Sequence, residues 1–260
     1  MKWIQQRIRS GKLLTGTFLN LGSSLTAEMA GLAGFDWVVV DLEHGSGDHH
    51  NLLVQLQALS GTSAVPLVRV AGNDPVLCKR ALDLGPAGIM VPWINSKEEA
   101  LKAAAAVRYP PIGLRGVAAM NRACGFGLSF DDYFQSANAE VTMIAQIETG
   151  QAVDNVKEIA SVDGVDVLFI GPLDLSVSLG IVKQFDHPDM RSARAKVVAA
   201  CREHGKAAGI LLSNASQIEE TIAEGFTFVG LGSDGAAAAL GLAKIASTLN
   251  ESKSNHKAKM

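Results

Sequence analysis

The chain has 260 residues, of which 48% are hydrophobic and 19% are charged, and its formal net charge is −3. This length suffices for one large α/β domain, and the high apolar content excludes intrinsic disorder for most of the chain. The nearly balanced charge and the lack of a basic cluster argue against a nucleic-acid partner.

The N-terminal segment carries charges but no apolar run as long as a signal peptide, and no stretch of about 18 apolar residues could span a membrane. The three cysteines, Cys78, Cys124 and Cys201, are far apart and form no CxxC pair. These features predict a cytoplasmic protein with reduced thiols and no membrane partner.

Eight short apolar runs alternate with helical patterns along the chain. The predicted strands are Thr15–Leu19, Trp37–Asp41, Val65–Val70, Gly88–Val91, Thr142–Ile147, Val167–Ile170, Ala207–Leu212 and Phe226–Gly230. Helices are predicted near residues 24–33, 49–60, 74–84, 96–107, 151–160, 188–204, 216–224 and 234–248. Nearly continuous hydrophobic strands are typical of a parallel sheet covered on both faces, so the pattern predicts an α/β fold, a closed (β/α)8 TIM barrel. The doubly wound alternative would carry a GxGxxG turn after its first strand, and residues 20–24 lack one.

The barrel is predicted to occupy residues 1–249 as a single domain. Residues 108–140 form a connection longer than a minimal barrel needs, which is typical of a functional or partner-contacting loop. Residues 250–260 are polar and rich in lysine, and we expect them to form a disordered tail.

Polar side chains gather where the predicted strands end, which is where such barrels place their chemistry. The four polar strand ends are Asp41-Leu42-Glu43-His44, Arg69, Gln146-Ile147-Glu148 and Leu173-Asp174. Glu148 and Asp174 follow adjacent strands, so their carboxylates are expected to converge. Two carboxylates with no nearby cysteine select a hard divalent cation, namely Mg²⁺, Mn²⁺ or Co²⁺.

Other uses of these side chains stay open at this point. The carboxylates could form an acid–base pair as in glycosidases, although few aromatic residues are present to hold a sugar ring. Each could also cap a helix, and Arg69 could form an ion pair with Glu148 or Asp41. No predicted strand contains a lysine that could form a Schiff base.

A histidine and an aspartate outside the strands are further candidates. His44 lies on the rim of the predicted mouth and could act as a general base near neutral pH, or be a structural loop residue. Asp83 stands near the C-terminus of a predicted helix, where the helix dipole disfavours negative charge. It could orient a histidine, as in hydrolase triads, or be a solvated carboxylate.

Taken together, these motifs resemble the HpcH/HpaI aldolase family over about residues 3–248. The motifs are VVDLEHG at 39–45, Arg69, LDLG at 82–85, QIET at 146–149 and GPLDLS at 171–176. The resemblance implies a divalent metal and reversible cleavage of a 4-hydroxy-2-keto acid into an aldehyde and pyruvate, or a related 2-keto acid such as hydroxypyruvate. It also implies a homohexamer, a trimer of dimers, in which partners exchange the last helix.

The same resemblance implies a role for each matching residue on the base side of the site. His44 would be the general base, and Asp83 would raise its basicity. Arg69 would bind substrate and stabilise the enolate and the transition state. Asp41 would position a water molecule at the metal.

On the metal side, the resemblance implies that Glu148 and Asp174 bind the cation. Gln146 would hold pyruvate together with the backbone of Leu173 and Asp174. Two other functions stay open: a lyase or synthase of the citrate lyase β type, which would use the same metal site on a CoA thioester, and a non-catalytic barrel that only binds a keto acid.

Overall fold

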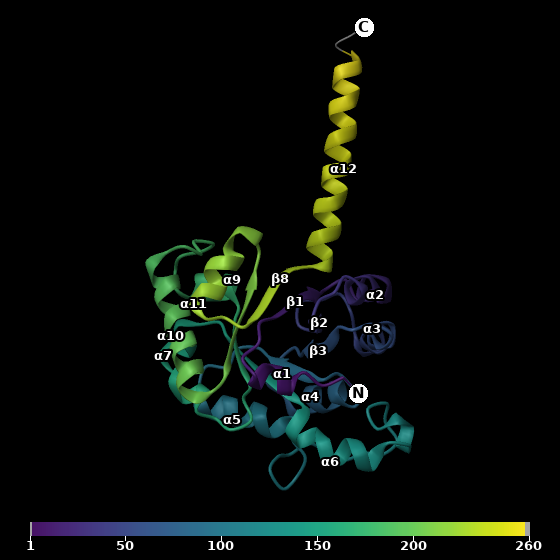
Figure 1. The fold of residues 1–260 in the computed structure, drawn as a ribbon, viewed down its shortest axis with the longest axis vertical. Helices are drawn as coiled ribbons and strands as arrows, with labels where there is room; N and C mark the ends of the chain where they lie inside the picture. Colours follow the sequence, from purple (N-terminus) through teal and green to yellow (C-terminus); the bar gives the residue numbers. More distant parts are fainter. Residues whose placement is uncertain (1, 258–260) are drawn as a thin grey trace.

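The computed structural model describes residues 2–257 and shows a closed parallel barrel whose strands follow one another in chain order (Figure 1). The strands are β1 (Leu14–Leu19), β2 (Trp37–Asp41), β3 (Val65–Arg69), β4 (Gly88–Val91), β5 (Thr142–Ile147), β6 (Val167–Ile170), β7 (Ala207–Leu212) and β8 (Phe228–Ser233). The (β/α)8 barrel predicted from the sequence is confirmed.

Helices surround this barrel and connect its strands. They are α1 (Gln5–Arg9), α2 (Ser24–Leu32), α3 (His49–Ser60), α4 (Pro75–Leu82), α5 (Lys97–Ala106), α6 (Phe130–Glu140), α7 (Gly150–Asp154), α8 (Val156–Ala160), α9 (Pro172–Ser178), α10 (Pro188–His204), α11 (Ile218–Glu224) and α12 (Asp234–Lys257). Short 3-10 turns lie at Gly125–Gly127 and Ala215–Gln217.

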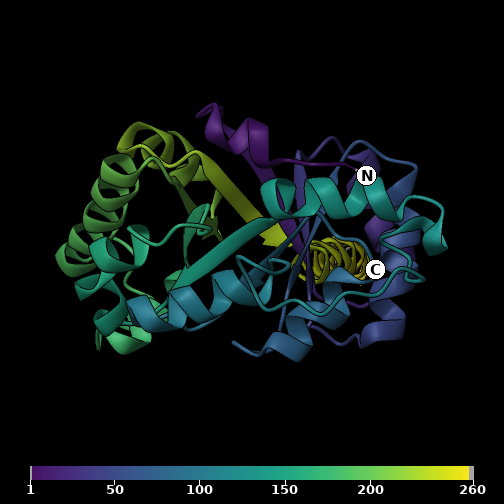
Figure 2. The same ribbon diagram turned by 90° about the horizontal axis from the view of Figure 1, so that it is seen from below.

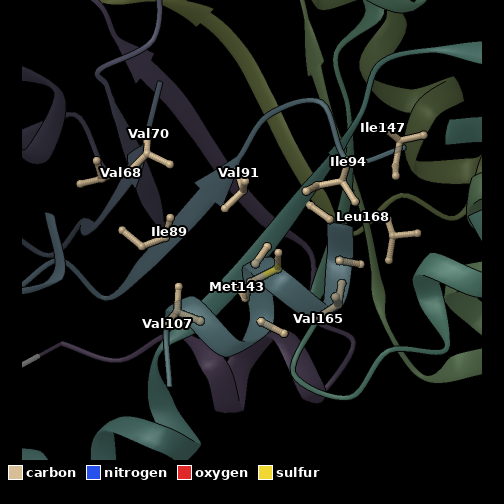
Figure 3. Packing of buried hydrophobic residues seen from close by; sticks show 14 of the residues in the cluster. Val68, Val70, Ile89, Val91, Ile94, Val107, Met143, Ile147, Val165 and Leu168 are labelled. Carbon is tan, nitrogen blue, oxygen red and sulfur yellow. The ribbon is translucent and has the colours of Figure 1, made fainter. Parts of the chain in front are cut away.

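Two apolar layers hold the barrel together. Inside it, Trp37, Phe169 and Phe228 form an aromatic cluster in which Trp37 and Phe228 stack with ring centroids 4.3 Å apart. Outside it, the opposite faces of the strands pack against the helices, as Figure 3 shows for Val68 and Leu168 and their neighbours. Successive strand residues face opposite sides, and both sides are covered, which explains the nearly continuous hydrophobic runs.

Parallel register brings the polar strand ends to one end of the barrel. Asp41 and Arg69 are register partners at the ends of β2 and β3. Gln146, which precedes Glu148 by two residues, is the register partner of Phe169 on β6. The hydroxyl of Thr149 accepts a hydrogen bond from the amide of Ala152 at 3.0 Å and so starts α7 directly after Glu148.

Several elements differ from the prediction. The structure contains α1, α6 and α9, where the sequence predicted no helix, and the helix predicted over 151–160 is broken at Asn155 into α7 and α8. Helices of five to seven residues, such as α1 and α9, are too short for a hydrophobic period to show. The last strand begins at Phe228 rather than Phe226.

Helix α12 leaves the barrel and projects away from it (Figure 1), and it is seen nearly end-on in Figure 2. Its residues 236–253 are all exposed. The helix continues to Lys257, in place of the disordered tail predicted from residue 250; residues 258–260 lie outside the described part. Hydroxyl-to-carbonyl hydrogen bonds such as Ser252 to Thr248, at 3.1 Å, support this extension, which contains no glycine or proline. No helix within residues 2–257 is long and apolar enough to cross a membrane.

Candidate active site

A cavity of about 310 Å³ opens at the C-terminal ends of the strands. Four of the predicted site residues line it: Asp41, His44, Arg69 and Leu173. Phe18 contributes an apolar side chain to the wall of this cavity, and Ser213 contributes a neutral polar one. The cavity therefore lies where barrel enzymes carry out their reactions.

The charged floor of this mouth is an ion-pair network centred on Arg69. Its Nε and Nη2 donate to the two oxygens of Asp41 at 2.9 and 2.6 Å, and its Nη1 lies 3.0 Å from Glu43 Oε2. An arginine has five N–H donors, so two of them stay available for a bound anion. The ion pair with Asp41, which the sequence left open, is what the structure shows.

The carboxylate of Asp41 accepts four hydrogen bonds in this network. Besides the two bonds from Arg69, its Oδ1 accepts the backbone amides of Glu43 and His44 at 3.0 and 3.2 Å. These bonds shape the turn after β2 and so fix where the next two side chains begin. Asp41 thus orients Arg69 and the turn. Its Oδ2 accepts a hydrogen bond from Arg69 Nη2 and has a further lone pair that could accept one from water, so the water-positioning role implied by the resemblance stays a prediction.

His44 extends from this turn into the cavity. Its imidazole is largely exposed, and its Nε2 lies 3.9 Å from Glu43 Oε2. The imidazole therefore stands in the cavity beside the carboxylate of Glu43.

Glu148 is a buried carboxylate at the end of β5. Its Oε1 accepts from Gln146 Nε2 at 2.7 Å, and its Oε2 accepts from the amide of Trp93 at 3.2 Å. Burial, together with the charges of Asp174 and Glu43, raises the pKa of Glu148 to about 7, against the lowering effects of the Trp93 amide and of Arg69. Three carboxylates therefore repel one another here, a repulsion that a cation would relieve.

Two neighbouring elements make room for this carboxylate. Gly171, just after β6, has no side chain, and a Cβ there would overlap Glu148 Oε1. Asp174 follows in the first turn of α9, with Leu173 beside it. The amides of Leu173 and Asp174 belong to the helix positions whose N–H groups have no acceptor within the helix.

The donor set fits a hard divalent cation. Glu148 and Asp174 offer carboxylate oxygens, and Oε1 of Gln146 is buried with no hydrogen-bond partner within the described residues. Oxygen donors of this kind suit Mg²⁺ or Mn²⁺. Across residues 2–257 no group of three or more His, Cys, Asp or Glu side chains is arranged to hold a metal, so substrate and water oxygens would have to supply the remaining ligands.

Asp83 is the one predicted residue that the structure does not bring to the mouth. It ends α4, next to the start of β4, and so lies at the opposite end of the barrel from His44. Its partner is the fully buried Arg115, whose Nη2 lies 3.0 Å away. Within one protomer Asp83 therefore cannot orient His44.

Glu43 is a site residue that the sequence analysis did not assign. Burial raises its pKa, and Arg69 and His44 counteract that effect. Its position two residues after Asp41 was the available signal, since alternate residues at a strand end face the same way.

Comparison with known proteins gives a family match. A family model described as HpcH/HpaI aldolase/citrate lyase matches residues 14–239. The curated 5-keto-4-deoxy-D-glucarate aldolases of Salmonella paratyphi C and Salmonella arizonae are each 42% identical over 236 residues, covering 91% of this chain and 92% of theirs.

Solved structures give the same result. An HpcH/HpaI aldolase/citrate lyase family protein from Burkholderia cenocepacia superposes with a TM-score of 0.90 at 37% identity, over 95% of this chain and 98% of that one. The citrate synthase SbnG superposes with a TM-score of 0.86 at 27% identity, over 97% and 99% of the two chains.

Proposed function

Because this chain belongs to the HpcH/HpaI aldolase/citrate lyase family, we propose that it is a divalent-metal-dependent aldolase. As a carbon–carbon lyase it would reversibly cleave a 4-hydroxy-2-keto acid into pyruvate, or a related 2-keto acid, and an aldehyde. The relatives with 42% identity bear the name 5-keto-4-deoxy-D-glucarate aldolase, so that keto acid is the first substrate to assay. The CoA-thioester and binding-only alternatives have no comparable support.

The observation that carries this proposal is the state of Glu148. This carboxylate is almost fully buried, is repelled by two other carboxylates and accepts hydrogen bonds from two donors. Such a costly arrangement is typical of a functional group, here a ligand for a cation. Glu148 stands beside Arg69, which retains free N–H donors. A pairing of a cation site with an arginine suits a substrate that is itself anionic and develops further charge.

Glu148 and Asp174 would hold Mg²⁺ or Mn²⁺, with Gln146 next to them. When bound, such a cation acts as a Lewis acid that withdraws electrons from the keto group of a bound 2-keto acid. Gln146 and the amides of Leu173 and Asp174 would hold the keto acid's oxygens in place.

Arg69 would stabilise the charge that develops when the bond between C3 and C4 breaks. Its fork is fixed by Asp41 and Glu43 before substrate arrives, so little reorganisation is needed during the reaction. This arrangement would lower the energy of the enolate, which then takes up a proton at C3 to give the keto acid.

His44 would act as the general base. In cleavage its imidazole would take the proton of the C4 hydroxyl, the C3–C4 electron pair would become the enolate, and the aldehyde would leave. In synthesis the same imidazole would remove a methyl proton from pyruvate. Its exposed position in the cavity allows both proton acceptance and return to water.

The assembly remains part of the proposal. The resemblance assigns Asp83 a role in raising the basicity of His44, and one protomer keeps these residues at opposite ends of the barrel. That role would therefore need Asp83 of a neighbouring protomer. The exposed apolar residues of α12, namely Leu240, Leu242, Ile245 and Leu249, support an oligomer with exchanged last helices, for which we propose the homohexamer.

Exchange of the pyruvate methyl protons in D₂O, followed by proton NMR, tests the chemistry without knowledge of the aldehyde. We expect exchange to stop after treatment with EDTA and to return with Mg²⁺ or Mn²⁺. His44→Ala should slow it strongly, whereas His50→Ala, which removes an exposed imidazole six residues away, should not. Exchange that continues in metal-free protein would refute the proposal, and pyruvate binding without exchange would indicate a binding protein.

A further inference from the structure

A second cavity, of about 550 Å³, lies at the other end of the barrel, where the chain enters the strands. Its walls come from the end of α1, the end of α5 and the segments just before β6 and β7. In Figure 1, α1 and α5 lie on the side of the barrel away from the departing α12. This cavity shares no residue with the mouth, so the proposed aldolase site does not account for it.

Three basic side chains line this cavity: Arg9, Arg108 and Lys206. Arg108 is the decisive one because its residue is only 6% exposed. Its Nη2 reaches Gly164 O at 3.4 Å and Asp166 Oδ2 at 3.6 Å, both long for contacts of a guanidinium. Its Nη1 is buried and has no hydrogen-bond partner among residues 2–257.

The nearby acids do not complete the coordination of Arg108. Asp166 already accepts bonds from the side chain of Gln5 and from the amide of Met143, the latter at 2.8 Å. Asp163 is exposed at the rim. Burial of the Arg108 charge is costly, and an anion in the cavity that Arg108 lines would reduce that cost.

The side chains of the remaining two cations donate to backbone carbonyls, and Lys206 also lies near the Asp166 carboxylate, whose pKa its charge lowers. Lys206 Nζ donates to Val162 O at 3.2 Å, and Arg9 Nη2 donates to Ala139 O at 3.5 Å. Neither contact neutralises its charge. Arg9 is close enough to Arg108 that its charge, after the larger effect of burial, lowers the pKa of Arg108.

The rest of the wall is apolar. Leu101, Ala104 and Ile112 face the cavity beside Ile8. A bare inorganic ion would leave this apolar surface in contact with water, whereas a ligand with a short hydrocarbon part would bury it.

We propose that this cavity binds a small organic anion, whose phosphate or carboxylate group meets Arg108, Arg9 and Lys206 and whose apolar part lies on Leu101, Ala104 and Ile112. The site would be separate from the aldolase mouth, and binding there would not depend on the aldol reaction. Its failure would leave the proposed function untouched, because no residue is common to both sites.

Calorimetric titration of the full chain with phenyl phosphate and with benzoate tests this proposal, and the two probes distinguish a phosphorylated ligand from a carboxylate. We expect saturable binding of at least one probe, with one molecule per chain. Arg9→Gln and Lys206→Gln should each weaken it at least about tenfold, as loss of a charged donor does. Arg108→Gln should abolish the binding. If that variant does not fold, the variants at the exposed Arg9 and the half-buried Lys206 still test the proposal.

Two matched variants serve as controls. Lys12→Gln removes an exposed charge from the same end of the barrel without touching the cavity, and Arg69→Gln removes the cation of the mouth. Neither should change the binding. No saturable binding of either probe at millimolar concentration would overturn the proposal, as would binding that Arg69→Gln weakens and Arg9→Gln leaves intact.

Discussion

The barrel interior has two levels that share strand β2 and are stabilised in opposite ways. The lower level is the aromatic cluster of Trp37, Phe169 and Phe228, in which every contact is apolar. The upper level, further along β2, β3 and β5, carries Asp41, Arg69 and the Gln146–Glu148 pair. The two levels adjoin each other between β5 and β6, where Gln146 and Phe169 are register partners.

The contrast shows where stability and chemistry are separated in this fold. Burying the aromatic rings is favourable in proportion to their area. Burying Glu148 is unfavourable, as its pKa of about 7 shows, and the surrounding protein has to supply the difference. Substitutions in the upper level should therefore affect activity first, and those in the lower level should affect stability first.

The largest expected effect is on the upper level. Glu148→Gln removes the charge proposed to hold the cation while keeping the side-chain shape. We expect kcat for the aldol reaction to fall about 10⁴-fold, equivalent to roughly 5 kcal/mol. Titration with Mn²⁺, followed by its paramagnetic effect on water protons, should show weaker metal binding in parallel.

Glu158→Gln provides the matched control, because Glu158 is exposed on α8 and far from the strand ends. It should retain both activity and Mn²⁺ binding. Full activity in Glu148→Gln would show that the upper level does not act through a cation at this carboxylate.

The lower level should show the reverse behaviour. Trp37→Ala opens a cavity against Phe228 and Phe169, and we expect the free energy of unfolding to fall by about 4 kcal/mol, measured with urea. Trp93→Ala makes the same change at a half-exposed ring and should cost less than about 1 kcal/mol. Equal losses in the two variants would contradict the division between the levels.

The charged level should also make the free energy of unfolding depend on pH. Burial raises the pKa of Glu148 from 4.5 to about 7, so the metal-free native protein holds this proton more tightly than the unfolded chain does. The resulting stability is present below about pH 4.5 and is lost as the pH rises through 7. We expect a loss of about 2 to 3 kcal/mol from this group.

Urea unfolding in EDTA at pH 5 and pH 8 measures this effect. Glu148→Gln lacks the titrating group, so its stability relative to the wild type should increase by that amount between the two pH values. Mg²⁺ should restore the wild type at pH 8 and leave the variant unchanged. A difference that is independent of pH would mean that Glu148 does not titrate in this range.

Much of the upper level could be predicted from the sequence because chain position and depth in a barrel are linked. A polar residue directly after an apolar run, such as Arg69 or Glu148, must lie at the strand exit. The pairing of Asp41 with Arg69 also required the register of β2 against β3, which periodicity does not reveal.

Asp83 illustrates what local reasoning left out. Its place at a helix end was predicted, and the structure makes it the C-cap of α4. A helix in this fold runs back from strand exit to strand entry, so its end lies opposite the mouth. Its partner Arg115 is 32 residues away in the long connection, beyond the reach of any local pattern.

The smallest expected effect lies outside both levels, at the start of α4. Asp74 accepts hydrogen bonds from the amides of Val76 and Leu77 at 2.7 and 3.2 Å, and Asp74→Ala should cost about 1 kcal/mol of stability. Asp131→Ala removes an acid from the first turn of α6 that is not a cap, and should cost less. Because α4 and α6 carry neither the aromatic cluster nor a residue of the charged mouth, pyruvate proton exchange should be unchanged in both variants. A loss of exchange in Asp74→Ala would mean that α4 also sets the position of Arg69, which precedes it in the chain.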